Sequence, residues 1–194
     1  QKKVDRAAPY IDIRGYHGHT IDSWLGEGHT FRELRAELEQ HDAEAWTYYN
    51  IREIAVTSEW VRLCNGYWLW RGPIRAHTPW TYYHYGNSPF DDLDSEQHDF
   101  AYAAPHPDEP KMVSTLEWEC YREGYDDLRY LATLEAAIEH AAAEAPDSPA
   151  LERARALRKT YWDADPRVPV QAETLTAADY AARRRDMTEA IRAL

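Results

Sequence analysis

The chain has 194 residues, 44% of them hydrophobic, and its 22 Lys and Arg against 34 Asp and Glu give a formal net charge of −12 at pH 7. This charge argues against nucleic acid or an anionic membrane surface as the main partner, and no apolar run approaches the roughly 20 residues that cross a bilayer. The length is sufficient for one domain with its own core but short of the about 250 residues of a complete (β/α)8 barrel.

Three segments are predicted to be β-strands. Residues 10–14 (YIDIR) alternate β-formers with polar residues, and the glycines of residues 15–19 indicate a loop after them. Residues 44–49 (EAWTYY) form a second, aromatic strand, and residues 75–84 alternate as a third. Asp12 lies inside the first of these segments, where we expect a buried structural acid.

Helices are predicted between and after the strands. Thr30 and Glu33 form a capping box before a helix that ends near His41. A second helix is indicated by apolar residues at spacings of 4, 3, 4 and 3 and is stopped by Gly72-Pro73. Its apolar residues are Val56, Trp60, Leu63, Tyr67 and Trp70. We assign Trp70 to packing.

The C-terminal half is predicted to be mainly helical. Ser114 and Glu117 form a capping box before a long amphipathic helix over 114–134, whose expected apolar face comprises Trp118, Tyr121, Tyr125, Leu128 and Leu131. Pro149 begins a further helix to about Trp162, and Thr176 with Asp179 begins the last one. Cys64 and Cys120 fall in helical contexts and are too few for a disulfide framework or a zinc site, so we expect two buried thiols.

Strands and helices that alternate with strand starts about 30–35 residues apart are typical of βα units in a parallel sheet. The connection over 86–113 is long and rich in Asp, Pro and His, and connections of this length inside a domain are usually functional or mobile. The sequence therefore predicts an α/β fold with three βα units.

Four motifs link this pattern to a known family. They are Trp46-Thr47-Tyr48-Tyr49-Asn50, Trp80-Thr81-Tyr82-Tyr83, Asp99-Phe100-Ala101-Tyr102 and Arg122-Glu123-Gly124-Tyr125-Asp126-Asp127. Over roughly residues 10–140 the chain resembles the glycoside-hydrolase-like TIM barrels grouped around family 123. The resemblance implies that residues 1–145 are the C-terminal portion of a (β/α)8 barrel with its closing helix, and that residues 146–194 are a helical extension.

The same resemblance implies a carbohydrate-active protein that forms a sugar-binding wall of such a barrel. The first five βα units are absent from this chain, and with them the acidic pair that performs catalysis in the family, so the catalytic residues are unknown and are expected outside the chain. Family chemistry would be retaining, substrate-assisted hydrolysis of an N-acetylhexosaminide. The alternative is a non-catalytic carbohydrate-binding or interaction domain.

The partners expected from this reading are an oligo- or polysaccharide and the N-terminal part of the same barrel, with no cofactor, no metal, no nucleic acid and no membrane insertion. The sequence leaves the compartment undecided, and the resemblance slightly favours a secreted or periplasmic location.

Candidate site residues follow from the rule that TIM-barrel active sites lie at the C-terminal ends of the strands. Aromatic rings would stack on a pyranose face, and polar groups would bond its hydroxyls. The residues expected to face a sugar are Arg14, His17, His19, Tyr48, Asn50, Arg52, Tyr82, His84 and Tyr85.

Two alternatives within the loops carry less weight. His17 and His19 could bind zinc with a third ligand from His29, Asp22 or Glu27, although sugar-contacting or surface histidines are favoured. Acids in the long connection could pair for glycoside hydrolysis, although a solvated loop or a weak calcium site is favoured. These acids are Asp91, Asp92, Asp94 and Glu96. We expect the charges of the 122–127 motif to form structural pairs that hold the long helix to the barrel wall.

Overall fold

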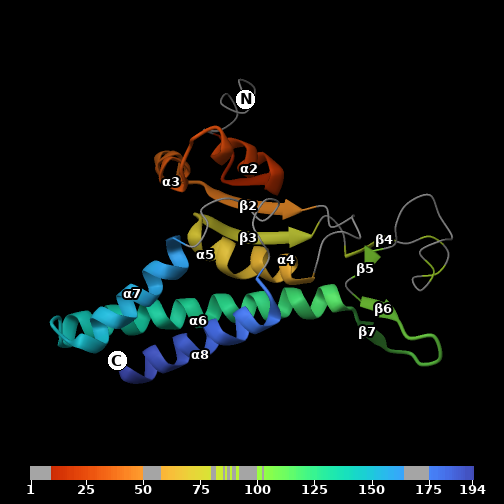
Figure 1. Cartoon of the computed structure of the whole chain (residues 1–194). Helices are drawn as coiled ribbons and strands as arrows, with labels where there is room; N and C mark the ends of the chain where they lie inside the picture. Colours follow the sequence, from red (N-terminus) through yellow and green to blue (C-terminus); the bar gives the residue numbers. More distant parts are fainter. Residues whose placement is uncertain are drawn as a thin grey trace.

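A small parallel sheet organises the N-terminal half of the molecule (Figure 1). The computed structural model describes residues 10–49, 58–79, 82–84, 86, 88, 91, 100–101, 103–163 and 175–194. The sheet contains β1 (Ile13–His17), β2 (Glu44–Tyr49) and β3 (Ile74–Pro79), in the order β1-β2-β3 and all parallel. The prediction of three parallel strands connected through helices is therefore confirmed.

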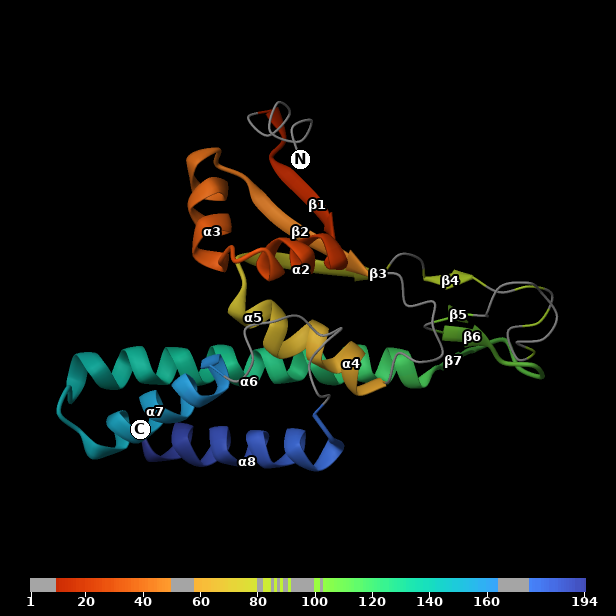
Figure 2. The same ribbon diagram turned by 45° about the horizontal axis from the view of Figure 1, so that its top comes forward.

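The strand boundaries differ from the sequence prediction. β1 begins at Ile13 and includes Gly15 to His17, which we expected in a loop, and Asp12 is an exposed residue before the strand rather than a buried acid within it. β3 ends at Pro79, and Tyr83–His84 forms a separate strand, β4, antiparallel to β5 (Phe100–Ala101). A third small sheet pairs β6 (Ala103–Pro105) with β7 (Met112–Ser114). The two antiparallel pairs lie beyond the C-terminal ends of β2 and β3 (Figures 1 and 2).

Two helices connect β1 to β2. Helix α2 (Gly18–Gly26) was not predicted, whereas α3 (Phe31–Gln40) begins and ends where its capping box and apolar spacing place it. The Thr30 hydroxyl accepts from the Glu33 backbone N–H, and the Glu33 carboxylate accepts from the Thr30 N–H at 2.8 Å. These bonds satisfy N–H groups that a helix start otherwise leaves without acceptors.

The helix before β3 is interrupted by a wider turn. It consists of α4 (Ser58–Leu63), a π-helical segment η2 (Cys64–Trp68) and α5 (Leu69–Arg71), and it ends at Gly72 as predicted. A π-turn contains one more residue than an α-turn, so the apolar residues no longer follow the expected single stripe. All five residues of η2 are buried.

In the described residues after Ser114 the chain forms three helices: α6 (Leu116–Glu144), α7 (Pro149–Asp163) and α8 (Ala177–Ala193). Thr115 caps α6, not Ser114, because its hydroxyl accepts from the Trp118 backbone N–H. Helix α7 begins at Pro149 as predicted, where the Ser148 hydroxyl accepts from the Ala150 backbone N–H at 3.2 Å. The predicted capping box of α8 is confirmed. No helix in the described ranges is long and apolar enough to span a membrane.

The two faces of the parallel sheet differ in environment. On one face, Ala45 and Ile74 pack against Ile21 of α2, Leu34 and Leu38 of α3, and Val61, Cys64 and Trp68 of the α4–η2 segment. On the other face, Ile13 is 51% exposed and Glu44, Gly15 and Thr78 are exposed as well. We call this second side the open face. The helices that follow β1 and β2 thus cover one side of the sheet only (Figure 2).

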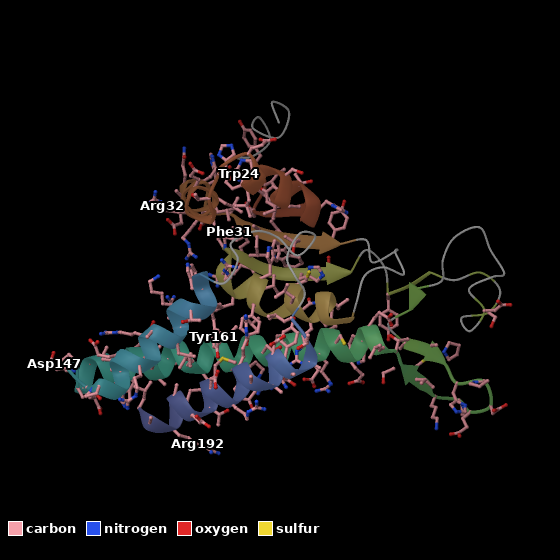
Figure 3. The ribbon with its side chains drawn as sticks, viewed as in Figure 1. Trp24, Phe31, Arg32, Asp147, Tyr161 and Arg192 are labelled. Carbon is pink, nitrogen blue, oxygen red and sulfur yellow. The ribbon has the colours of Figure 1, made fainter. Side chains whose placement is uncertain are left out.

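A second core lies between η2 and the C-terminal helices. Tyr67 of η2 packs with the buried residues of α6, α7 and α8, which are Leu131, Leu134, Ile138, Ala141, Leu151, Ala154, Tyr161, Tyr180 and Met187. Tyr161 points from α7 into this cluster (Figure 3), where its hydroxyl donates to Asp186 of α8 at 3.2 Å. Helices α7 and α8 therefore share a core with η2 and α6.

The expected apolar face of α6 is rotated. Tyr125 is 57% and Trp118 39% exposed, whereas Gly124 and Asp127 are buried in their place. Cys64 is buried and Cys120 partly buried, and neither forms a disulfide.

Candidate functional site

Register across the sheet brings residues of the open face together near the strand ends. His17 lies opposite Tyr48, and Tyr48 lies opposite Thr78. The His17 and Tyr48 rings meet edge to face with centroids 5.0 Å apart and an interplanar angle of 88°. Both side chains are partly exposed, so the two rings form an aromatic surface that includes an imidazole and a phenol.

Trp46 extends this surface along β2, although it is not among the residues that the sequence predicts to face a sugar. It precedes Tyr48 by two residues and therefore shares its face, between Gly15 of β1 and Ala76 of β3. The absence of large side chains at these two neighbours leaves the indole partly exposed. Its Nε1 donates to Glu44 at 3.4 Å. The alternation of Trp46 and Tyr48 was the signal that could have identified it.

Arg14 does not belong to this surface. It is 5% exposed and lies on the helix-covered side of β1, where its guanidinium forms an ion pair with Glu37 of α3 at 2.5 Å. The expectation that it faces a sugar is therefore wrong. The reason is alternation: β1 runs to His17 instead of ending at Arg14, so Arg14 and His17 point to opposite faces.

The remaining predicted site residues are placed only in part. Tyr82 follows β3 and is 48% exposed. His84 lies in β4 and His19 in the first turn of α2, with side chains outside the described residues, and Asn50, Arg52 and Tyr85 also fall outside them. Of the predicted set, the structure thus brings His17 and Tyr48 together.

A buried polar group supports the strand ends from the helix side. Thr47 Oγ1 and His77 Nδ1 are 3.2 Å apart, and the Tyr121 hydroxyl of α6 donates to the His77 carbonyl at 2.9 Å. Burial lowers the pKa of His77 to about 4, so its imidazole is neutral at pH 7, and burial raises the pKa of Tyr121. These bonds connect β2, β3 and α6 behind the open face.

The described residues provide no set of ligands for the zinc site suggested at His17 and His19. Within them, no three His, Cys, Asp or Glu side chains lie close enough to hold a metal ion. His29, the suggested third ligand, stacks on Trp24 with centroids 4.5 Å apart and approaches Glu33 at 3.4 Å. In the acidic loop, Asp91 is exposed, and Asp92, Asp94 and Glu96 fall outside the described residues.

The charges of the 122–127 motif do form structural pairs, as expected, but with other helices instead of the strands. Asp127 is fully buried and accepts from Arg62 of α4 at 2.7 Å and from Arg184 of α8. Glu123 lies 2.7 Å from Arg184 and 3.7 Å from Arg62. The motif therefore joins α6 to α4 and α8.

Close packing of α6 against the α4–η2 segment explains why residue 124 of this motif is glycine. A Cβ at Gly124 would lie 2.5 Å from the Arg62 carbonyl oxygen and 2.9 Å from Asn65 Cβ, and a Cβ at Gly66 would lie 2.8 Å from the Gly124 oxygen. Two glycines thus allow α6 and the α4–η2 segment to approach at backbone distance.

Comparison with known proteins adds no relative: no family model matches the chain, and neither a curated protein nor a solved structure matches it. Function therefore has to be inferred from the chemistry of the open face. Its described residues offer aromatic rings, an imidazole and hydroxyls, which suit a polyhydroxylated ligand. Its carboxylate in the described part, Glu44, lies at the start of β2, away from His17 and Tyr48.

Proposed function

We propose that this chain forms three βα units of a glycoside-hydrolase-like (β/α)8 barrel, with a helical extension, and contributes part of a sugar-binding wall. The observation that supports this most is the winding of the sheet. Its strands are parallel and in sequential order β1-β2-β3, and the helices that follow β1 and β2 cover one face. Successive right-handed crossovers in one direction are the winding of a barrel. They are also the winding of each half of a doubly wound sheet, which reverses direction between its halves and so has helices on both faces.

The open face supports the same proposal. Parallel sheets are found almost only with both faces covered, yet here Ile13 and Thr78 are exposed on one side. Within the described residues, β1 and β3 each pair with β2 and with no further strand. The N-terminal units of the same barrel would pair with these edges and enclose the open face.

The ligand proposed for this face is a neutral sugar residue. A pyranose has one face of C–H groups, which packs on an aromatic ring, and a rim of hydroxyls, which bond to polar groups. Tyr48 and Trp46 supply ring area, and His17 supplies a donor or acceptor next to them.

Catalysis would need two carboxyl groups about 5–9.5 Å apart, or an acid that orients the acetamido group of the substrate together with one that protonates the leaving oxygen. The described open face has no such pair near His17 and Tyr48. The chain alone is therefore expected to be a poor hydrolase. The same observation favours the alternative function, a non-catalytic carbohydrate-binding domain.

Calorimetric titration with neutral oligosaccharides tests the binding site. Tyr48→Ala should weaken binding by about 1–3 kcal/mol, because stacking area and a hydroxyl partner are lost. Tyr125→Ala, which truncates an exposed tyrosine on α6, is the matched control and should bind as the unchanged chain does. Equal affinity of both variants would contradict the strand-end site. Turnover of aryl N-acetylhexosaminides that is lost in Asp91→Asn would instead place catalysis in the acidic loop.

A further inference from the structure

A groove lies at the opposite end of the sheet from His17 and Tyr48. It has a volume of about 620 Å³ and is bounded by α3, α5, α6 and α7. Figure 1 shows α7 rising toward α5 below α3. The groove is lined by Arg35, Trp70, Glu135, Arg155, Arg158 and Trp162, together with Ile138 and Glu139. Its volume is in the range of small-molecule sites, about 300–1,000 Å³.

Two tryptophans form an ordered wall of this groove. Trp70 and Trp162 meet edge to face with centroids 5.1 Å apart, and the Arg158 guanidinium lies 4.9 Å from the Trp162 ring and 5.6 Å from the Trp70 ring. Glu135 accepts from Arg158 at 2.7 and 2.9 Å. Because Arg158 is held by both the Glu135 carboxylate and the two indole rings, the aromatic wall is ordered before any ligand binds.

Basic side chains outnumber acidic ones around the groove, which is lined by Arg35, Arg155 and Arg158 against Glu135 and Glu139. Residues 146–194 carry nine Lys and Arg against eight Asp and Glu, whereas the whole chain has a net charge of −12. Arg35 and Arg155 line the groove from α3 and α7, and neither forms an ion pair with a residue of the described part of the chain. Two guanidinium groups across an aromatic wall can bind a carboxylate or sulfate through paired N–H donors.

Acidic side chains outnumber basic ones on the far side of Trp70. The adjoining cavity, of about 540 Å³, shares Arg35 and Trp70 with the groove, and its other charged lining residues are Glu39, Asp42, Glu44 and Arg75. An anionic group is therefore favoured next to Arg155 and disfavoured beyond Trp70, where carboxylates can accept hydrogen bonds from hydroxyls. This arrangement suits a ligand that has an anionic group at one position and hydroxyls at the next.

We infer that this groove binds an anionic sugar residue, a uronate or a sulfated pyranose, as a second saccharide site distinct from the strand-end site. The choice of a saccharide rests on the proposed function together with the indole wall. The negative charge of the ligand is inferred from Arg35 and Arg155. The two sites lie at opposite ends of the strands, so they can be tested independently.

The experiment measures binding to the full chain by calorimetry at low and moderate salt. The probes are a tetrasaccharide of galacturonate, a sulfated galactan tetrasaccharide, a neutral galactan tetrasaccharide and a tetraglutamate peptide. At least one anionic sugar should bind at least tenfold more tightly than the neutral sugar and the peptide, and its affinity should fall as salt screens the charges. The uronate and sulfate probes distinguish the two sources of negative charge.

Variants locate the binding. The double variant Arg35→Gln/Arg155→Gln should lose at least tenfold in affinity for the anionic sugar, whereas Arg153→Gln, on the same helix but outside the groove lining, should lose none. Tyr48→Ala should leave this binding unchanged. If it abolishes both neutral and anionic binding, there is one site and the inference is wrong, while the proposed function stands.

Other outcomes also decide the matter. Anionic binding that persists when no neutral sugar binds would support the groove and count against the proposed strand-end site. Tightest binding of tetraglutamate would overturn the saccharide assignment and indicate an acidic peptide. Absence of binding by both anionic sugars, or equal losses in the double variant and in Arg153→Gln, would overturn the inference altogether.

Discussion

Replacing Gly124 by Ala tests the close approach of α6 to the α4–η2 segment. The new Cβ would lie 2.5 Å from the Arg62 carbonyl oxygen and 2.9 Å from Asn65 Cβ, so the two helices have to move apart. Overpacking of this kind costs about 1–3 kcal/mol, occasionally more, while Ala gains about 1 kcal/mol over Gly in a helix interior. The contact is with backbone, which cannot rotate away, so we take the upper end of the cost and expect a net loss of about 2 kcal/mol.

Urea denaturation followed by circular dichroism measures the change in the free energy of unfolding. Gly26→Ala is the matched control, because it adds the same methyl group at the end of α2, where no atom lies within 4 Å of the new Cβ. That variant should change stability by no more than about 0.5 kcal/mol. A Gly124→Ala protein as stable as the unchanged chain, or more stable, would refute the argument that backbone contact requires glycine.

Three further predictions concern buried groups. Asp127→Asn should lower the free energy of unfolding by about 3 kcal/mol, the lower end for breaking a buried ion pair, because Arg62 and Arg184 lose their buried carboxylate and keep only Glu123. Asp126→Asn, in surface pairs, should cost less than about 1 kcal/mol. The pKa of His77 is about 4 in the folded chain and about 6.5 when unfolded; stability should therefore fall by up to roughly 3 kcal/mol as the pH drops from 6.5 to 4. Denaturation at several pH values should show this loss reduced in His77→Gln and retained in His140→Gln, which alters an exposed histidine. Trp70→Ala should cost about 2–3 kcal/mol in the same denaturation assay, less than a fully buried tryptophan, because its ring is only partly buried; no measurable loss would show that the ring contributes little to packing.

Local signals allowed several elements to be predicted closely. Thr30 with Glu33 and Thr176 with Asp179 determine helix starts through bonds within four residues, and both capping boxes are present. The parallel arrangement of the strands also followed from sequence, because connections long enough to hold a helix permit a crossover. The helix starts depend on neighbours in the chain, and the parallel arrangement depends on the length of the connections.

Tertiary contacts determined what the sequence did not predict. Gly15 favours a loop by composition, yet it pairs with Trp46 in the sheet and so extends β1 to His17. In the longer strand, the Arg14 side chain lies on the helix-covered face and not on the face predicted to bind a sugar. In η2, the apolar spacing of 3 and 4 predicts a continuous α-helix. The structure has a π-helical segment instead, in which Trp68 packs in the core beneath the sheet and Tyr67 in the core of the C-terminal helices. In α6, Tyr125 was expected inside, but the burial of Asp127 with two arginines directs another face inward.

The π-helical segment has a consequence for how the molecule unfolds. Cys64 and Trp68 belong to the core beneath the sheet, while Tyr67 between them belongs to the core of the C-terminal helices. A segment that is a wall of both cores cannot melt on one side and persist on the other, so the sheet and the helical extension should open together as one cooperative unit. Hydrogen exchange would then show similar protection for the amides of β2 and α8, with no separately stable C-terminal fragment.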